Sequence, residues 1–305
     1  MPVKTSGQLS LRDDIRAEVG GATTNVSLRS LSANVGFSSP DAMSEFYGYS
    51  SFEQSRIYWR GDGVNDTLRA QGFSITSSNS PLTWAGWYRL DSNGSGVEQL
   101  GSLSTSAPSG RNQFFLQYDG RFNRIYWRFR LNNVFCQRQY PLHDNPNRAI
   151  TGITNASPGW SSGQRGNVNR DGFVHLTFTW NPTDTSSNAL QLYWNAQQLT
   201  YSVNNQNGNR SGYAIGSIGV GDLVSTPGNN ANVWQGGIDN VGIWNRVLSQ
   251  TQINTIYNGG VPATVTSLGV TQNILAEYRL EGDPANFAGS FPNLQNNNGG
   301  QFISY

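Results

Sequence analysis

The chain has 305 residues, of which 36% are hydrophobic, and its 20 basic residues nearly balance 19 acidic ones, for a formal net charge of +1. This balance gives no global field that would draw the protein to nucleic acid or to a membrane, so we expect neither as a partner. The single cysteine, Cys136, excludes an internal disulfide.

The first residues, "MPVKTSGQLS", lack the apolar stretch of a signal peptide, and no apolar run approaches the roughly 20 residues that span a bilayer. We therefore expect the protein to be made and assembled in a cytoplasm.

Residues 1–50 have the pattern of an arm with three short helices. Ser10, Ser27 and Ser39 can each cap one of them, and glycines follow each helix. Helices of about two turns bury little core by themselves, so the arm must dock either on its own β domain or on another protein, and we expect another protein. The apolar face of this arm consists of Leu11, Ile15, Leu28, Leu31, Met43, Phe46 and Tyr47.

From about residue 56 the pattern is that of β-strands. Residues 83–90 predict a strand, residues 172–180 predict a strand with one core face, and residues 190–199 predict a strand that turns at Asn195 and Ala196. Turn signals separate these segments. In residues 123–132 apolar and polar residues alternate, which predicts a half-buried strand with one core face and one cationic face. The cationic face consists of Arg124, Tyr126, Arg128 and Arg130. We expect an all-β, two-sheet antiparallel sandwich over residues 51–305.

A short helix is predicted near the end of this pattern. Ser249 followed by Gln252 has the spacing of a capping box, and Gly259 ends the segment. Ile253 and Ile256 form an apolar face that must pack on the sandwich.

The order of these segments resembles the laminin-G-like, concanavalin A-like jelly-roll domains. The segments that carry the resemblance are "YWRGDGVNDTLRA", "TWAGWYRL", "GFVHLTFTW", "LQLYWNAQQL" and "GGIDNVGIWNRVLSQTQINTIYNGG", which together span about 58–260. Residues 273–305 are expected to close the sandwich. The resemblance implies a structural calcium ion at Asp62, Asp66 and Asp239, and the alternative is that these aspartates cap turns. No other cofactor is expected.

The arm, "GQLSLRDDIRAEVGG…NVSLRSLSANVG…MSEFYGYS", is similar to segments of tailed-phage virion proteins. This resemblance implies a non-enzymatic virion structural protein, assembled in the host bacterial cytoplasm, as a head decoration or cement protein or as a tail or fibre component. Its partners would be the major capsid or tail protein and further copies of itself.

The alternative is a carbohydrate-binding lectin or adhesin that attaches to a host-surface glycan. Trp160 lies among loop-forming residues and is either an exposed platform for a sugar or a packing residue, and Arg124, Arg128 and Arg130 would contact the glycan or a partner.

Catalysis is not expected from the carboxylates. Jelly-roll enzymes that cut β-glucans need two acids about 5.5 Å apart. The nearest approach in the sequence, Glu277 and Glu281, separates two acids by about 13 Å if both lie on one strand.

Overall fold

A computed structural model describes residues 57–77, 81–91, 97–104, 113–120, 124–131, 134–142, 173–184, 189–205, 213–221, 233–260 and 262–304. The expected arm of residues 1–50, its apolar residues and Trp160 lie outside the described residues, and the division at residue 51 stays a prediction. Among the described residues, no helix is long and apolar enough to cross a bilayer.

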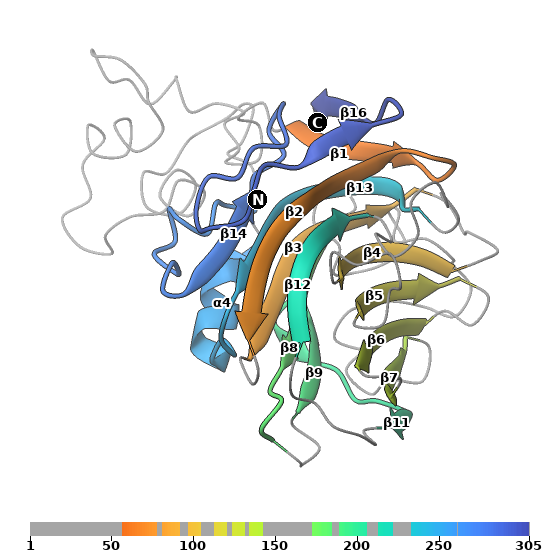
Figure 1. Cartoon of the computed structure of the whole chain (residues 1–305), viewed down its shortest axis with the longest axis vertical. Helices are drawn as coiled ribbons and strands as arrows, with labels where there is room; N and C mark the ends of the chain where they lie inside the picture. The colour runs from red at the N-terminus through yellow and green to blue at the C-terminus, as the bar shows by residue number, and fades with distance from the viewer. Residues whose placement is uncertain are drawn as a thin grey trace, which may run out of the picture. The chain divides into compact units, whose positions relative to one another are not determined.

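Two antiparallel sheets of eight strands each make up the described chain (Figure 1). Sheet A contains β1 (Ile57–Asp62), β3 (Leu82–Leu90), β8 (Val174–Trp180), β9 (Leu190–Trp194), β10 (Gln197–Gln198), β13 (Gln235–Trp244), β14 (Ile274–Tyr278) and β16 (Gln301–Ser304). Sheet B contains β2 (Thr67–Ser77), β4 (Val97–Ser104), β5 (Gln113–Asp119), β6 (Arg124–Leu131), β7 (Val134–Pro141), β11 (Val203–Asn205), β12 (Tyr213–Val220) and β15 (Gln295–Asn297). The predicted two-sheet sandwich is confirmed.

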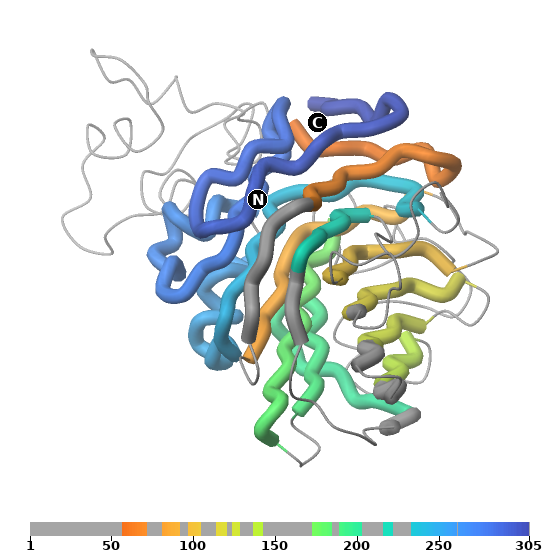
Figure 2. The backbone as a smooth tube through the Cα atoms, in the orientation of Figure 1, coloured from red at the N-terminus to blue at the C-terminus, as the bar shows by residue number. Residues whose placement is uncertain are grey.

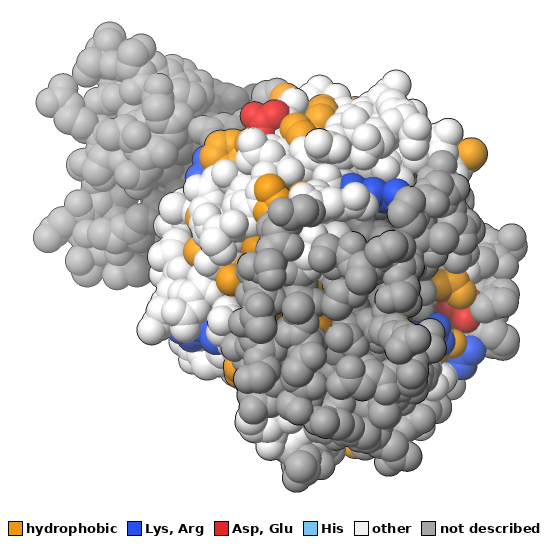
Figure 3. Space-filling model, in the orientation of Figure 1, with side chains coloured by type: hydrophobic (Ala, Val, Ile, Leu, Met, Phe, Trp, Pro, Cys, Tyr) orange, Lys and Arg blue, Asp and Glu red, His pale blue; other side chains and the backbone are white. Residues whose placement is uncertain are grey.

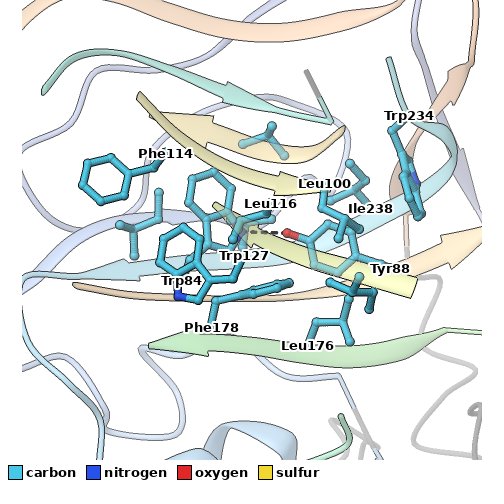
Figure 4. Packing of buried hydrophobic residues seen from close by; sticks show 14 of the residues in the cluster. Trp84, Tyr88, Leu100, Phe114, Leu116, Trp127, Leu176, Phe178, Trp234 and Ile238 are labelled. Atoms are coloured by element: carbon cyan, nitrogen blue, oxygen red, sulfur yellow. Dashed lines mark hydrogen bonds between the residues drawn. The ribbon is translucent and has the colours of Figure 1, made fainter. Parts of the chain in front are cut away.

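Aromatic side chains from both sheets meet in the core (Figure 4). Trp84 and Phe178 come from sheet A, and Phe114 and Trp127 come from sheet B. The indole of Trp84 donates a hydrogen bond of 2.7 Å to the hydroxyl of Tyr88, so even the polar edge of this ring has a partner inside the core.

The hairpin of β9 and β10 turns at Asn195 and Ala196, as predicted. Both residues have positive φ, of 48° and 63°. Ala196 therefore occupies a left-handed position that glycine adopts at lower cost.

The predicted helix is α4 (Gln250–Tyr257), followed by a short 3-10 turn, η3 (Asn258–Gly260). Its capping box is present: the Ser249 hydroxyl accepts from the backbone of Gln252, whose side chain accepts from the backbone N–H of Ser249. Ile253 and Ile256 are buried in a cluster with Trp244, on the face of sheet A that points away from the core.

Helix α4 also covers the second face of strand β8. The sequence predicts one core face for β8, but every residue of this strand is buried. Val174 and Leu176 face the core, whereas His175 lies on the opposite face, where its ring is 5.0 Å from Trp87 and 6.1 Å from Tyr257 of α4. Both faces of this part of sheet A are therefore covered.

The segment after α4 closes the sandwich, as expected. β14 pairs with β13, and β16 lies beside β1, so the first and last strands of the described chain are neighbours (Figure 2). β14 ends at Tyr278, so Glu281 lies outside the strand on which the sequence suggested it. Glu277 is 1% exposed, and its carboxylate accepts hydrogen bonds from the backbone and hydroxyl of Thr266, which makes it a structural group.

Candidate binding site

The cationic face predicted for residues 123–132 exists on β6. Ile125 and Trp127 are buried in the core, and Arg124, Tyr126 and Arg128 lie on the opposite face. Arg130 is on the same strand and in the same alternation, but its side chain lies outside the described set.

The strand register extends this face across sheet B. Tyr126 pairs with Gln117 on β5 and with Gln139 on β7, and Gln117 pairs with Gln99 on β4. Directly paired residues in antiparallel strands point to the same side. We therefore define the polar face of sheet B by Gln99, Gln117, Asp119, Arg124, Tyr126, Arg128 and Gln139.

Both arginines of the polar face are held in place by glutamine amides. Arg128 Nη1 donates to Gln117 Oε1 at 2.8 Å, and Arg124 Nη1 donates to Gln139 Oε1 at 2.7 Å. Both guanidinium groups also lie over the ring of Tyr126, with Cζ 3.7 Å from its centroid for Arg128 and 4.9 Å for Arg124. These contacts hold the two guanidinium groups close together before any ligand binds. Binding a ligand would therefore cost little further side-chain entropy.

One acid accompanies these two cations. Asp119 is 1% exposed, accepts a hydrogen bond of 3.3 Å from the Tyr126 hydroxyl, and lies 3.8 Å from Arg124. Burial raises the pKa of Tyr126 and lowers the pKa of Arg128. An arginine stays protonated in proteins at neutral pH, so two guanidinium groups beside one acid give the polar face an excess of positive charge.

Arg124 and Arg128 are partly exposed, as is Gln139, whereas the other described side chains of this face are buried. Tyr126 is 2% exposed and Gln117 is 8% exposed, whereas the Arg124 side chain is 25% exposed. On the side of the molecule shown in Figure 3, charged side chains occur as small separate groups among the residues described there. Solvent therefore reaches the two guanidinium groups more readily than the ring of Tyr126.

Gln99 is the exception within this row. It is 0% exposed, and neither its amide nitrogen nor its amide oxygen has a hydrogen-bond partner in the described part of the chain. A buried amide without a partner costs free energy, so Gln99 is a stability liability at the edge of the polar face.

The three aspartates expected at a calcium site are not brought together. Asp62 and Asp66 are close, since Asp66 Oδ2 accepts from the backbone N–H of Asp62 at 3.1 Å. Asp62 pairs with Gln235 of β13, whereas Asp239 lies four residues farther along that strand, about 13 Å away. Among the described ranges, no group of three or more His, Cys, Asp or Glu residues could hold a metal ion.

Asp62 does what the alternative interpretation expected, because its Oδ1 accepts from the backbone N–H groups of Val64 at 2.7 Å and Asn65 at 3.2 Å. It therefore caps the turn between β1 and β2.

The sequence places the arginines on one face of a strand, but it does not show which side chains position them. Gln117 and Gln139 come from strands whose pairing with β6 is not visible in a single sequence. Tyr126 was placed on the cationic face, but its position beneath both guanidinium groups was not foreseen. The alternation of arginine with an aromatic residue in "RIYWR" is the signal that could have indicated it.

Comparisons with known proteins support the fold. No family model and no curated protein matches the chain. Among solved structures, the heptameric SAP-like pentraxin of Limulus polyphemus is 13% identical, with 81% of this chain and 94% of that chain covered and a TM-score of 0.50.

Two further solved structures are less similar. A candidate carbohydrate-binding protein of Bacteroides ovatus is 9% identical over 82% of this chain and 60% of its own, with a TM-score of 0.48. Domains LG4-5 of the mouse laminin α1 chain are 9% identical over 64% of this chain and 43% of their own, with a TM-score of 0.41. At these identities the likeness concerns the fold alone, and the expected jelly-roll sandwich is confirmed.

Proposed function

We propose that this protein is a non-catalytic binding protein whose polar face on sheet B takes an acidic saccharide. The observation that carries the proposal is the pair of partly exposed guanidinium groups, Arg124 and Arg128, fixed over one tyrosine ring by two glutamine amides. Guanidinium groups bind carboxylates and sulfates through charge-assisted hydrogen bonds.

Nucleic acid fits this face less well. Proteins that bind single strands stack bases on exposed aromatic rings. Tyr126 is 2% exposed and lies beneath two guanidinium groups, so its ring offers no free surface for a base.

The test is a titration of the full chain with oligogalacturonate, which carries a carboxylate on each sugar, and with neutral maltodextrin of the same length. We expect preferential binding of the acidic chain, weakened by added salt. Arg128→Gln should weaken binding about ten- to hundredfold, because a hydrogen bond to a charged group contributes about 1.5–3 kcal/mol.

Arg246→Gln is the matched control, since Arg246 also donates to a glutamine, Gln272, at 2.6 Å, but lies next to α4. Equal binding of both oligosaccharides, or equal loss in both variants, contradicts the proposal.

A second candidate rests on the sequence of residues 1–50, which is similar to segments of tailed-phage virion proteins. In this proposal the arm anchors the protein to a capsid or tail protein, several copies assemble in the particle, and the jelly roll is displayed or cements its neighbours. The two candidates are compatible if the displayed domain binds a host-surface glycan.

This candidate is tested on particles. Mass spectrometry should detect the chain in purified virions, and crosslinks should join residues of the arm to a capsid or tail protein. A chain without residues 1–50 that still enters particles at the normal copy number would rule out the arm as the anchor.

A further inference from the structure

A hollow of about 430 Å³ lies at the corner where β1, β13 and the β15–β16 hairpin meet. Its walls include Arg60, Asp62, Asp66 and Gln235 on one side and Asn298 and Gln301 of the hairpin on the other. The volume lies at the low end of the range for small-molecule sites, roughly 300–1,000 Å³, and suits a ligand of monosaccharide size.

The hollow is preformed because the hairpin is fixed around its turn. Trp59 Nε1 donates to Asn296 Oδ1 at 3.1 Å, and Asn298 Nδ2 donates to the carbonyl of Asn65 at 2.8 Å. Gly300 lies so close to Trp59 that an added Cβ would come within 2.4 Å of the indole nitrogen. The hairpin therefore cannot move away without breaking contacts with β1 and the turn that follows it.

The two acids in this wall are placed differently. Asp62 is held by the turn, and although burial raises its pKa, the hydrogen bonds from Val64 and Asn65 outweigh burial and leave that pKa below its ordinary value. Asp66 is only 5% exposed, and the backbone N–H of Asp62 gives its one hydrogen bond among the described residues. Burial raises the pKa of Asp66. Its carboxyl group thus lines the hollow as a buried acceptor with capacity for a further donor.

The rest of the wall contains both donors and acceptors. Gln235, Asn298 and Gln301 carry amides, and Arg60 carries a guanidinium group whose Nε donates to Asp91 at 2.7 Å. A sugar hydroxyl both donates and accepts, so it can use all of these groups. A hard cation would instead require six to eight oxygen ligands, and here it would lie beside the positive charge of Arg60.

We propose that this hollow binds a neutral, hydroxyl-rich ligand of monosaccharide size, with Asp66 and Gln301 in direct contact with its hydroxyls. The site is separate from the polar face of sheet B, since strand β12 and strand β2 lie between β4 and β15.

The experiment uses the full chain and the methyl glycosides of glucose, galactose, mannose and N-acetylglucosamine as probes, in buffer with EDTA. Ligand-observed NMR titration should show saturable binding of at least one of them. Gln301→Ala should weaken that binding about three- to tenfold, the loss expected for one hydrogen bond. Gln295→Ala is the matched control, an exposed glutamine of the same hairpin that does not line the hollow, and it should bind as the wild type does.

Three outcomes overturn the proposal: none of the four glycosides binds, binding requires added calcium, or Gln301→Ala equals the control. Arg128→Gln separates this site from the polar face. It should leave glycoside binding unchanged even if the acidic saccharide proves not to bind, and a loss of glycoside binding in Arg128→Gln would place the sugar on the polar face instead.

Discussion

His175 should make the fold sensitive to mild acid. The imidazole is 2% exposed between Trp87 and Tyr257, and its Nδ1 has no hydrogen-bond partner in the described part of the chain. Burial lowers the pKa of His175 from 6.5 to about 3. The folded protein therefore keeps this ring neutral at a pH where the unfolded chain protonates it.

The sign and the size follow from this difference in pKa. Above pH 6.5, His175 is neutral in both states and does not affect how the free energy of unfolding changes with pH. As the pH falls from 6.5 toward 3, this free energy falls, because only the unfolded chain takes up the proton in this range. Between pH 7.5 and pH 5 the loss in the free energy of unfolding is about 2 kcal/mol.

Urea denaturation of the full chain at pH 7.5 and pH 5 measures this loss. Other groups titrate as well, so the relevant quantity is the difference between wild type and His175→Gln, which has no imidazole at this position. The variant should lose about 2 kcal/mol less than the wild type over this pH range. His175→Phe provides a second non-titrating variant if His175→Gln is too unstable. An equal pH dependence in wild type and in the variants would refute the reasoning.

Two further substitutions test the packing of sheet B. Gln99→Met replaces the buried amide that lacks a partner with an apolar side chain of similar shape, and it should raise the free energy of unfolding by about 1–3 kcal/mol in a urea titration; a decrease would show that the amide is satisfied in solution. Gly101→Ala adds a Cβ 2.4 Å from the buried ring of Trp84. This substitution should lower the free energy of unfolding by about 1–3 kcal/mol, and with it the midpoint of thermal unfolding. An unchanged midpoint would show that Trp84 can move.

Local patterns in the sequence account for the elements that were predicted. The alternation in residues 123–132 reports which side of β6 is apolar, and the structure places Ile125 and Trp127 in the core accordingly. Ser249 and Gln252 identify the start of α4 because a capping box involves residues only three positions apart. Such features depend on near neighbours, so one sequence contains them.

Pairings between distant segments account for what was missed. The second buried face of β8 exists because α4, more than 70 residues later, covers it. The supports of Arg128 and Arg124 come from β5 and β7, and no local pattern states which strands will be neighbours. Asp62, Asp66 and Asp239 looked like one site because the resemblance aligned them, but the spacing along β13 keeps the third apart.

The adjacency of β1 and β16 has a consequence for the time course of folding. Residues at the beginning of the sandwich find this neighbour more than 200 positions downstream. Closing so long a loop is slow. Until it closes, the edge of β1 has unpaired backbone groups that can pair with a strand of another chain. We expect the nascent protein to pass through a stage in which this edge of β1 is unpaired. At a high rate of synthesis, chains should aggregate through this edge until the β15–β16 hairpin covers it.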